Sequence, residues 1–154
     1  MPSSPTPDHI LDQLLTRFPG TTAVDAWGET SLFYNPGQRL PRGVYFATIK
    51  QKDGDNDKAS QLDRPGVFRL NLGTSKPLFV ERFGTPPKRP AKGGCVAEPW
   101  DFTELDQLTP HPVYGWMSWV SVLNPSAQTL TTIDPLICAA FEKALAAFEK
   151  KTVR

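Results

Sequence analysis

The position of helix-forming patterns at the two ends of this 154-residue chain most constrains its fold. From Thr6 to Phe18, apolar residues recur every three or four positions, behind a threonine that can cap a helix and a proline suited to its first turn. A second such pattern begins at Asp134, which we expect to cap the final helix, and ends with Lys150 and Lys151, whose charges complement the helix dipole. Whatever core the chain builds must therefore accommodate one helix from each end.

The central part of the chain consists mainly of short β-like runs. A single short helix is predicted there, at residues 76–83. Runs rich in β-branched and aromatic residues, bounded by turn-forming residues, predict strands at residues 21–27, 30–34, 44–50, 67–72 and 115–123. This order predicts an α+β fold: a single small domain with an antiparallel sheet of about five strands, and with the N- and C-terminal helices packed on one face.

The size of the chain predicts one domain, because 154 residues can build one hydrophobic core but rarely two. We expect a disordered tail at residues 1–5 and a single domain at residues 6–151. Within the domain, residues 85–95 should form an exposed loop, since this Pro-, Gly- and Lys/Arg-rich stretch has little apolar area to bury.

Charge and composition exclude several classes of protein. The net charge is only +1, whereas nucleic-acid binders usually carry a clear basic excess, so a nucleic-acid partner is disfavoured. The sequence shows neither a secretory signal nor an apolar run long enough to cross a bilayer, and its two cysteines do not form a disulfide framework. We therefore expect a soluble cytoplasmic protein without a membrane partner; the sequence does not indicate its oligomeric state.

Known catalytic and cofactor motifs do not occur in the chain. There is no phosphate-binding Walker loop, dinucleotide glycine pattern, HExxH or GxSxG, so we expect neither a cofactor nor a metal ion. Residues 53–57 place carboxylates at alternate positions, as calcium loops do. The sixth and twelfth positions of that loop would be Lys58 and Arg64 instead of the required glycine and glutamate, which favours a solvated hairpin tip.

The best candidate for a functional group is His111, which lies between Pro110 and Pro112 at the start of a predicted strand. Proline disfavours the helical region for the residue before it, so the imidazole is mounted on a stiff, extended segment. It could transfer protons near pH 7, with the hydroxyl of Tyr114 orienting a substrate. Alternatively, His111 only caps a loop or bonds a backbone carbonyl.

Arg69 is the second candidate, because it places a charge inside the apolar strand at residues 67–72. A buried guanidinium must be paired or must meet an anion. Glu29 and Asp63 are possible partners, and a solvated position on an edge strand is the alternative. The other candidate ligand-binding residues are aromatic or polar side chains near these segments: Trp27, Glu29, Tyr34, Arg64, Asn71, Trp116 and Trp119.

Four segments carry a family resemblance over residues 8–150: AWGET at 26–30, FATI at 46–49, LDRPGVFRLN at 62–71 and HPVYG at 111–115. Together they resemble the domain of unknown function 6194 family of small bacterial and fungal proteins. That family implies no catalytic residues, since it has no established activity. More distantly, the layout is similar to YjbR/MmcQ-type proteins, which have a small antiparallel sheet with helices on one side and a proposed double-wing DNA-binding role.

These observations favour a domain that binds a small organic molecule between sheet and loops. It would carry out cofactor-independent acid–base chemistry of the isomerase, cyclase or lyase type, with His111, Tyr114 and Arg69 as the catalytic groups. One alternative is a nucleic-acid module that uses Lys88, Arg89 and Lys92 beside exposed aromatic residues. Another is a non-catalytic interaction domain.

Overall fold

The computed structural model describes residues 4–96 and 99–153, so residues 1–3 of the expected tail lie outside the described residues. The helices are α1 (Pro7–Arg17), α2 (Lys76–Phe83), α3 (Ala127–Thr132) and α4 (Asp134–Thr152), with short 3-10 helices η1 (Pro36–Gln38) and η2 (Gly115–Met117). The strands are β1 (Thr21–Ala26), β2 (Glu29–Tyr34), β3 (Val44–Lys50), β4 (Arg69–Gly73), β5 (Leu108–Pro110) and β6 (Trp119–Leu123).

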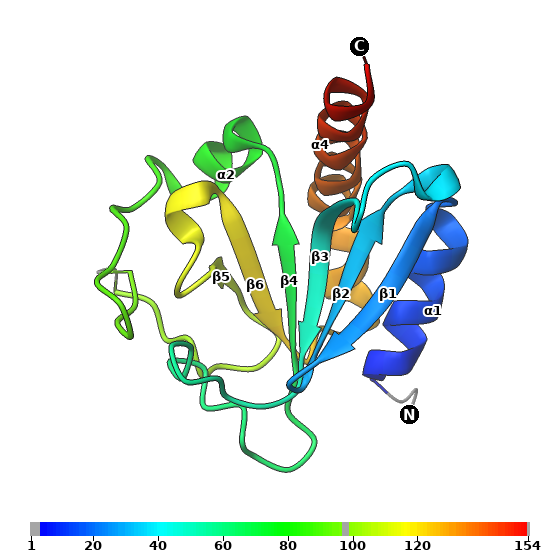
Figure 1. Cartoon of the computed structure of the whole chain (residues 1–154). Coiled ribbons are helices and arrows are strands. Elements are labelled where there is room, and N and C mark those ends of the chain that lie inside the picture. The colour runs from blue at the N-terminus through cyan, green and yellow to red at the C-terminus, as the bar shows by residue number, and fades with distance from the viewer. Residues whose placement is uncertain (1–3, 97–98, 154) are drawn as a thin grey trace.

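The strands form one antiparallel sheet of six strands, in the order β1-β2-β3-β4-β6-β5 (Figure 1). The predicted α+β class and the antiparallel sheet are confirmed. The sixth strand, β5, has only three residues, and a β-like pattern of that length cannot be distinguished from a loop. It pairs with β6 from Leu108↔Val122 to Pro110↔Val120, which places the segment before His111 at a sheet edge.

The helices α1 and α4 pack on the same face of the sheet, as predicted (Figure 1). The register lines up Leu32, Ala47, Leu72 and Val120 across the four central strands, and all four are fully buried against the helices. From the helices, apolar side chains spaced three or four residues apart complete this core: Ile10 and Leu14 from α1, and Leu136, Ile137, Ala140, Ala144 and Phe148 from α4.

The caps of the two terminal helices follow the prediction in one case and depart from it in the other. The Thr6 side chain accepts a hydrogen bond from the backbone N–H of His9 at 3.1 Å and caps α1, as expected. The prediction for Asp134 is wrong. Ile133 is the N-cap of α4, and the Asp134 carboxylate instead accepts hydrogen bonds from the Arg17 guanidinium, which ties the two helices together.

The strand predicted at residues 115–123 is shorter than expected. Residues Gly115–Met117 form η2, and Ser118 adopts a left-handed conformation with φ of 68° that ends this helix. The strand β6 therefore begins only at Trp119, whose carbonyl accepts a hydrogen bond from the His111 N–H at 2.9 Å. The segment from His111 to Trp119 is thus a compact loop closed on itself.

Candidate functional site

The face of the sheet that points away from α1 and α4, here called the polar face, carries a row of polar side chains. Strand register places Ser31, Thr48, Asn71, Ser121 and Thr109 side by side across five strands. All but Ser31 are buried, although in β3, β4 and β6 the residues before and after them along the strand are apolar core residues of the other face. Because buried polar groups need hydrogen-bond partners, this row requires a network above it.

Arg69 is the centre of that network and is completely buried. Its Nε donates to Asn71 Oδ1 at 2.7 Å, and its Nη1 donates to Ser60 Oγ and to Asp57 Oδ1, each at 3.0 Å. Its Nη2 donates to the second carboxylate oxygen of Asp57, which makes a bidentate ion pair. Asn71 extends the network to the Thr48 and Ser121 hydroxyls, at 2.9 and 2.7 Å.

The loop between β3 and β4 brings Asp57 and Ser60 onto the polar face. Gly54 and Asp57 pair as a short antiparallel bridge, and the Asp53 carboxylate accepts a hydrogen bond from the Leu62 N–H at 2.8 Å. Arg64 then fastens the loop by donating to the carbonyls of Gln61, Ser60 and Thr103. The segment expected to be a solvated hairpin tip therefore supplies the counterion of the buried arginine.

His111 lies next to Arg69 and is 3% exposed. Its Nδ1 accepts hydrogen bonds from the backbone N–H groups of Val113 and Tyr114, both at 3.0 Å. An acceptor Nδ1 places the proton of the neutral ring on Nε2. The Nε2 atom lies 3.4 Å from Arg69 Nη2, so two N–H donors face one another in the interior.

Burial and charge set the protonation of this cluster. Burial first, and then the positive charge of Arg69, hold the pKa of His111 well below 6.5, against an opposing effect of Asp57. For Asp57, burial favours the neutral form, but the hydrogen bonds and charge of Arg69 outweigh it and hold the pKa of this carboxyl below its usual range. At neutral pH the cluster therefore contains a guanidinium, a carboxylate and a neutral imidazole.

A hollow of about 320 Å³ lies beside this cluster. It is lined by Asn56, which precedes the counterion Asp57, and by Val113 and Tyr114, whose N–H groups hold His111. Its remaining wall comes from Trp116 and the basic loop at residues 89–93, where the Arg89 guanidinium lies over the Trp116 ring at 5.0 Å. The hollow is thus partly aromatic and partly cationic.

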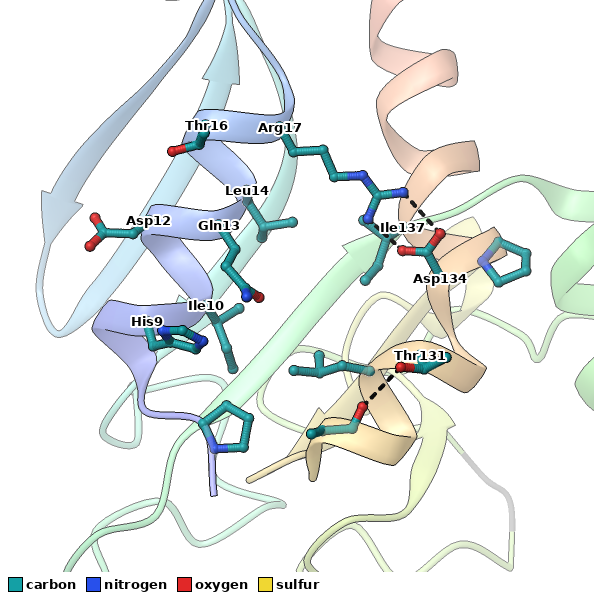
Figure 2. Close-up of a pocket in the computed structure, with 14 residues that line it drawn as sticks. His9, Ile10, Asp12, Gln13, Leu14, Thr16, Arg17, Thr131, Asp134 and Ile137 are labelled. Carbon is teal, nitrogen blue, oxygen red and sulfur yellow. Dashed lines mark hydrogen bonds and ion pairs between the residues drawn. The ribbon is translucent and has the colours of Figure 1, made fainter. Parts of the chain in front are cut away.

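A larger hollow, about 1010 Å³, is a groove between α1 and the α3–α4 corner (Figure 2). Ile10 and Leu14 point into it, and the Arg17–Asp134 ion pair spans one end. The Arg17 and Asp134 side chains are 40% and 42% exposed, and each already has the other as its charged partner. This groove contains none of the residues that the sequence singled out for function.

The structure brings together four of the predicted site residues: Arg69, Asn71, His111 and Trp119 all lie on or beside the polar face, within one connected cluster. Tyr114 stands at its rim, with its ring centroid 5.0 Å from that of His111. Trp116 lies apart from Trp119, in the wall of the adjacent hollow.

Other predicted residues lie elsewhere. Trp27 is 91% exposed in the β1–β2 turn, and Tyr34 packs on the helix face against Phe141 and Phe148. Arg64 donates hydrogen bonds to backbone carbonyls of the loop between β3 and β4. Glu29 approaches Lys50 at 3.7 Å, so neither Glu29 nor Asp63 is the partner of Arg69, which pairs with Asp57 instead.

Sequence reasoning missed Asp57, Ser60, Thr48 and Ser121. For the two strand residues a signal existed, since polar residues alternate with core residues at a period of two in β3 and β6. For Asp57 and Ser60 the local sequence is that of an ordinary polar loop, and only the path of the chain over the sheet reveals their partners.

The family of unknown function DUF6194 matches residues 5–153, nearly the whole chain. The chain belongs to this family. No curated protein and no solved structure matches this DUF6194 member.

Two further observations concern the described part of this DUF6194 chain. None of its helices combines the length and the apolar character needed to span a membrane. Within residues 4–96 and 99–153, no three His, Cys, Asp or Glu side chains come together in a geometry that could hold a metal ion.

Proposed function

We propose that this domain binds a small molecule through an anionic or polarised oxygen, and that Arg69 and His111 hold this oxygen. The observation that carries the proposal is the pair of facing donors, Arg69 Nη2 and His111 Nε2–H, at 3.4 Å. The other four guanidinium hydrogens have acceptors, and Nδ1 of His111 is occupied by two backbone donors. A buried donor without an acceptor is costly, so this pair is suited to receive one from a ligand.

The geometry supports a single shared oxygen. An acceptor atom can lie about 2.9 Å from each of two nitrogens that are themselves 3.4 Å apart, at ordinary hydrogen-bond lengths. One of the donors carries a full charge, and hydrogen bonds with an ionised partner are roughly twice as strong as neutral ones. A carboxylate or a developing oxyanion fits this pair better than a neutral carbonyl.

The hollow next to the cluster offers a path for the rest of the ligand. It shares Tyr114 with the rim of the cluster and carries the cations Arg89 and Lys92, which attract an anion. Because His111 is 3% exposed, the ligand reaches Nε2 when the Tyr114 side chain, itself 46% exposed, swings aside. The loop that carries Asn56 and Asp57 forms the opposite wall.

Such a site suits chemistry in which negative charge develops on an oxygen. Fixed donors in a water-poor environment stabilise an enolate or a similar oxyanion, as isomerisation, cyclisation or elimination next to a carbonyl requires. The low pKa of His111 keeps it neutral, so in this proposal it acts as a hydrogen-bond donor through Nε2–H. Tyr114 supplies the orienting hydroxyl, and no cofactor is needed.

Substitution of His111 by asparagine tests the proposal. Asparagine Oδ1 can take the place of Nδ1 and accept the Val113 and Tyr114 N–H groups, while Nε2–H is lost. Titration of benzoate and cyclohexanecarboxylate by calorimetry should show binding to the native protein and at least tenfold weaker binding to His111→Asn. The matched control is His9→Asn, at the only other histidine, which is exposed on α1. Absence of binding to the native protein, or equal losses in both variants, contradicts the proposal.

A further inference from the structure

A row of aromatic rings runs along the polar face and ends at the proposed oxygen site. Phe33 and Tyr45 are cross-strand neighbours with ring centroids 5.8 Å apart, and Tyr45 lies 5.3 Å from the Trp119 indole. From Trp119 the row continues to His111 at 6.3 Å and then to Tyr114 at 5.0 Å. These are the separations at which aromatic rings attract each other.

Gly73 determines how Trp119 sits in this row. The two residues are paired in neighbouring strands, and a Cβ atom at Gly73 would lie 2.7 Å from Cε2 and Cζ2 of the indole. The indole can therefore lie close against the bare backbone of β4 only because residue 73 has no side chain. Trp119 is 8% exposed and therefore lies deeper in the surface than the two tyrosines of the row, Tyr45 and Tyr114.

The rings of Tyr45 and Tyr114 are open to solvent. Tyr45 is 48% exposed and Tyr114 is 46% exposed, whereas the aromatic side chains of the opposite face are packed under α1 and α4. Burial raises the pKa of Tyr45, with smaller contributions from Tyr114 and Glu29. Exposed aromatic rings on a sheet face offer a stacking surface for planar molecules.

We infer that the ligand is a planar aromatic carboxylate, whose ring stacks between Tyr45 and Tyr114 over Trp119. This inference rests on the proposed function, because the carboxylate is the group that Arg69 and His111 receive. The charges fit an anion, since the guanidinium of Arg69 and the cations Arg89 and Lys92 lie at the same end of the row. The flat faces of the row select an aromatic ring over a saturated one of equal size.

Two probes of equal charge and similar size test the inference: benzoate and cyclohexanecarboxylate. Stacking should make the native protein bind benzoate about tenfold more tightly than cyclohexanecarboxylate in calorimetric titrations. Equal affinity for the two probes overturns the inference and leaves the oxygen site standing. Failure of both probes to bind refutes the proposed function itself, so the two failures are distinguishable.

A pair of variants locates the ring. Tyr45→Leu keeps an apolar side chain at a half-exposed position and should reduce the preference for benzoate to less than threefold, without changing the affinity for cyclohexanecarboxylate. Trp27→Leu is the matched control, since it removes a 91% exposed aromatic ring in the β1–β2 turn, away from the row. Retention of the full preference in Tyr45→Leu, or an equal loss in Trp27→Leu, overturns the assignment of the ring to this surface.

Discussion

Replacement of Arg69 by methionine should be strongly destabilising, because it leaves the Asp57 carboxylate without its counterion. The Arg69 side chain is fully buried and that of Asp57 is 17% exposed. Breaking a buried ion pair from one side costs about 3–5 kcal/mol. Partial access of water to Asp57 places the expected loss at the lower end, about 3 kcal/mol. Asn71 Oδ1 keeps the Ser121 hydroxyl as a donor, whereas Ser60 Oγ loses the donor that Arg69 supplies.

A matched control lies on the other side of the molecule. Arg17→Met removes the same group from the pair with Asp134, whose side chains are 40% and 42% exposed. Exposed pairs contribute about 0–1 kcal/mol, so this variant should be nearly neutral. In a chain of this size, 1 kcal/mol shifts the melting temperature by roughly 2–4 °C. Arg69→Met should therefore melt roughly 6–12 °C below the native protein, and Arg17→Met less than about 4 °C below it.

The pH dependence separates charge from lost packing. In the native protein the lowered pKa of Asp57 stabilises the fold above the unfolded pKa of this group, and this contribution is lost as the pH falls through the folded pKa. In Arg69→Met the Asp57 carboxyl is buried without a partner, which raises its pKa. Protonation at lower pH then removes the buried charge and increases the stability of the variant. Urea titrations should show the stability gap between the two proteins narrowing from pH 7 to about pH 4.

The double variant Arg69→Met, Asp57→Asn provides the decisive comparison. Removing both charges should recover at least about 1 kcal/mol relative to Arg69→Met alone, because no ion remains unpaired. Calorimetric melting and urea titration of the native protein, of Arg69→Met, of Asp57→Asn and of the double variant measure this coupling. Additive losses, or a stability gap that is independent of pH, would refute the assignment of Asp57 as the counterion that makes the buried guanidinium tolerable.

Two further predictions concern the same face. Gly73→Ala forces its new Cβ against the Trp119 indole and should cost about 1–3 kcal/mol, with a changed near-ultraviolet circular dichroism spectrum; an unchanged spectrum contradicts the packing described. Nitrogen-15 NMR should find His111 neutral at pH 6 with its proton on Nε2, and the low pKa predicts that stability falls as the pH drops from about 7 to about 5, since only the unfolded chain takes up the proton. A His111 ring that titrates between pH 6 and 7 contradicts this account.

Much of the architecture was accessible from local patterns. The periodicity of α1 and α4, the β-branched runs and the punctuating prolines predicted an α+β domain with both terminal helices on one face. Among the missed elements, β5 and α3 have three and six residues and are too short to show a period, and the 3-10 helices η1 and η2 have three residues each. The predicted N-cap of α4 was wrong because the Asp134 carboxylate accepts hydrogen bonds from Arg17, 117 residues earlier in the chain. Local sequence rules do not include such a distant partner.

The sequence by itself determined that His111 sits on a rigid segment, because proline geometry follows from the residues alone. For Arg69 it determined only that a partner is needed if the side chain is buried, and the burial itself was left open. Tertiary structure decided which groups meet: Asp57, His111 and Ser121 reach the Arg69–Asn71 pair from 12, 42 and 50 residues away. It also decided the proton position on His111, through the turn that aims two backbone N–H groups at Nδ1. The type of a side chain is known from the sequence, whereas the residues that it contacts depend on how the six strands are ordered in the sheet.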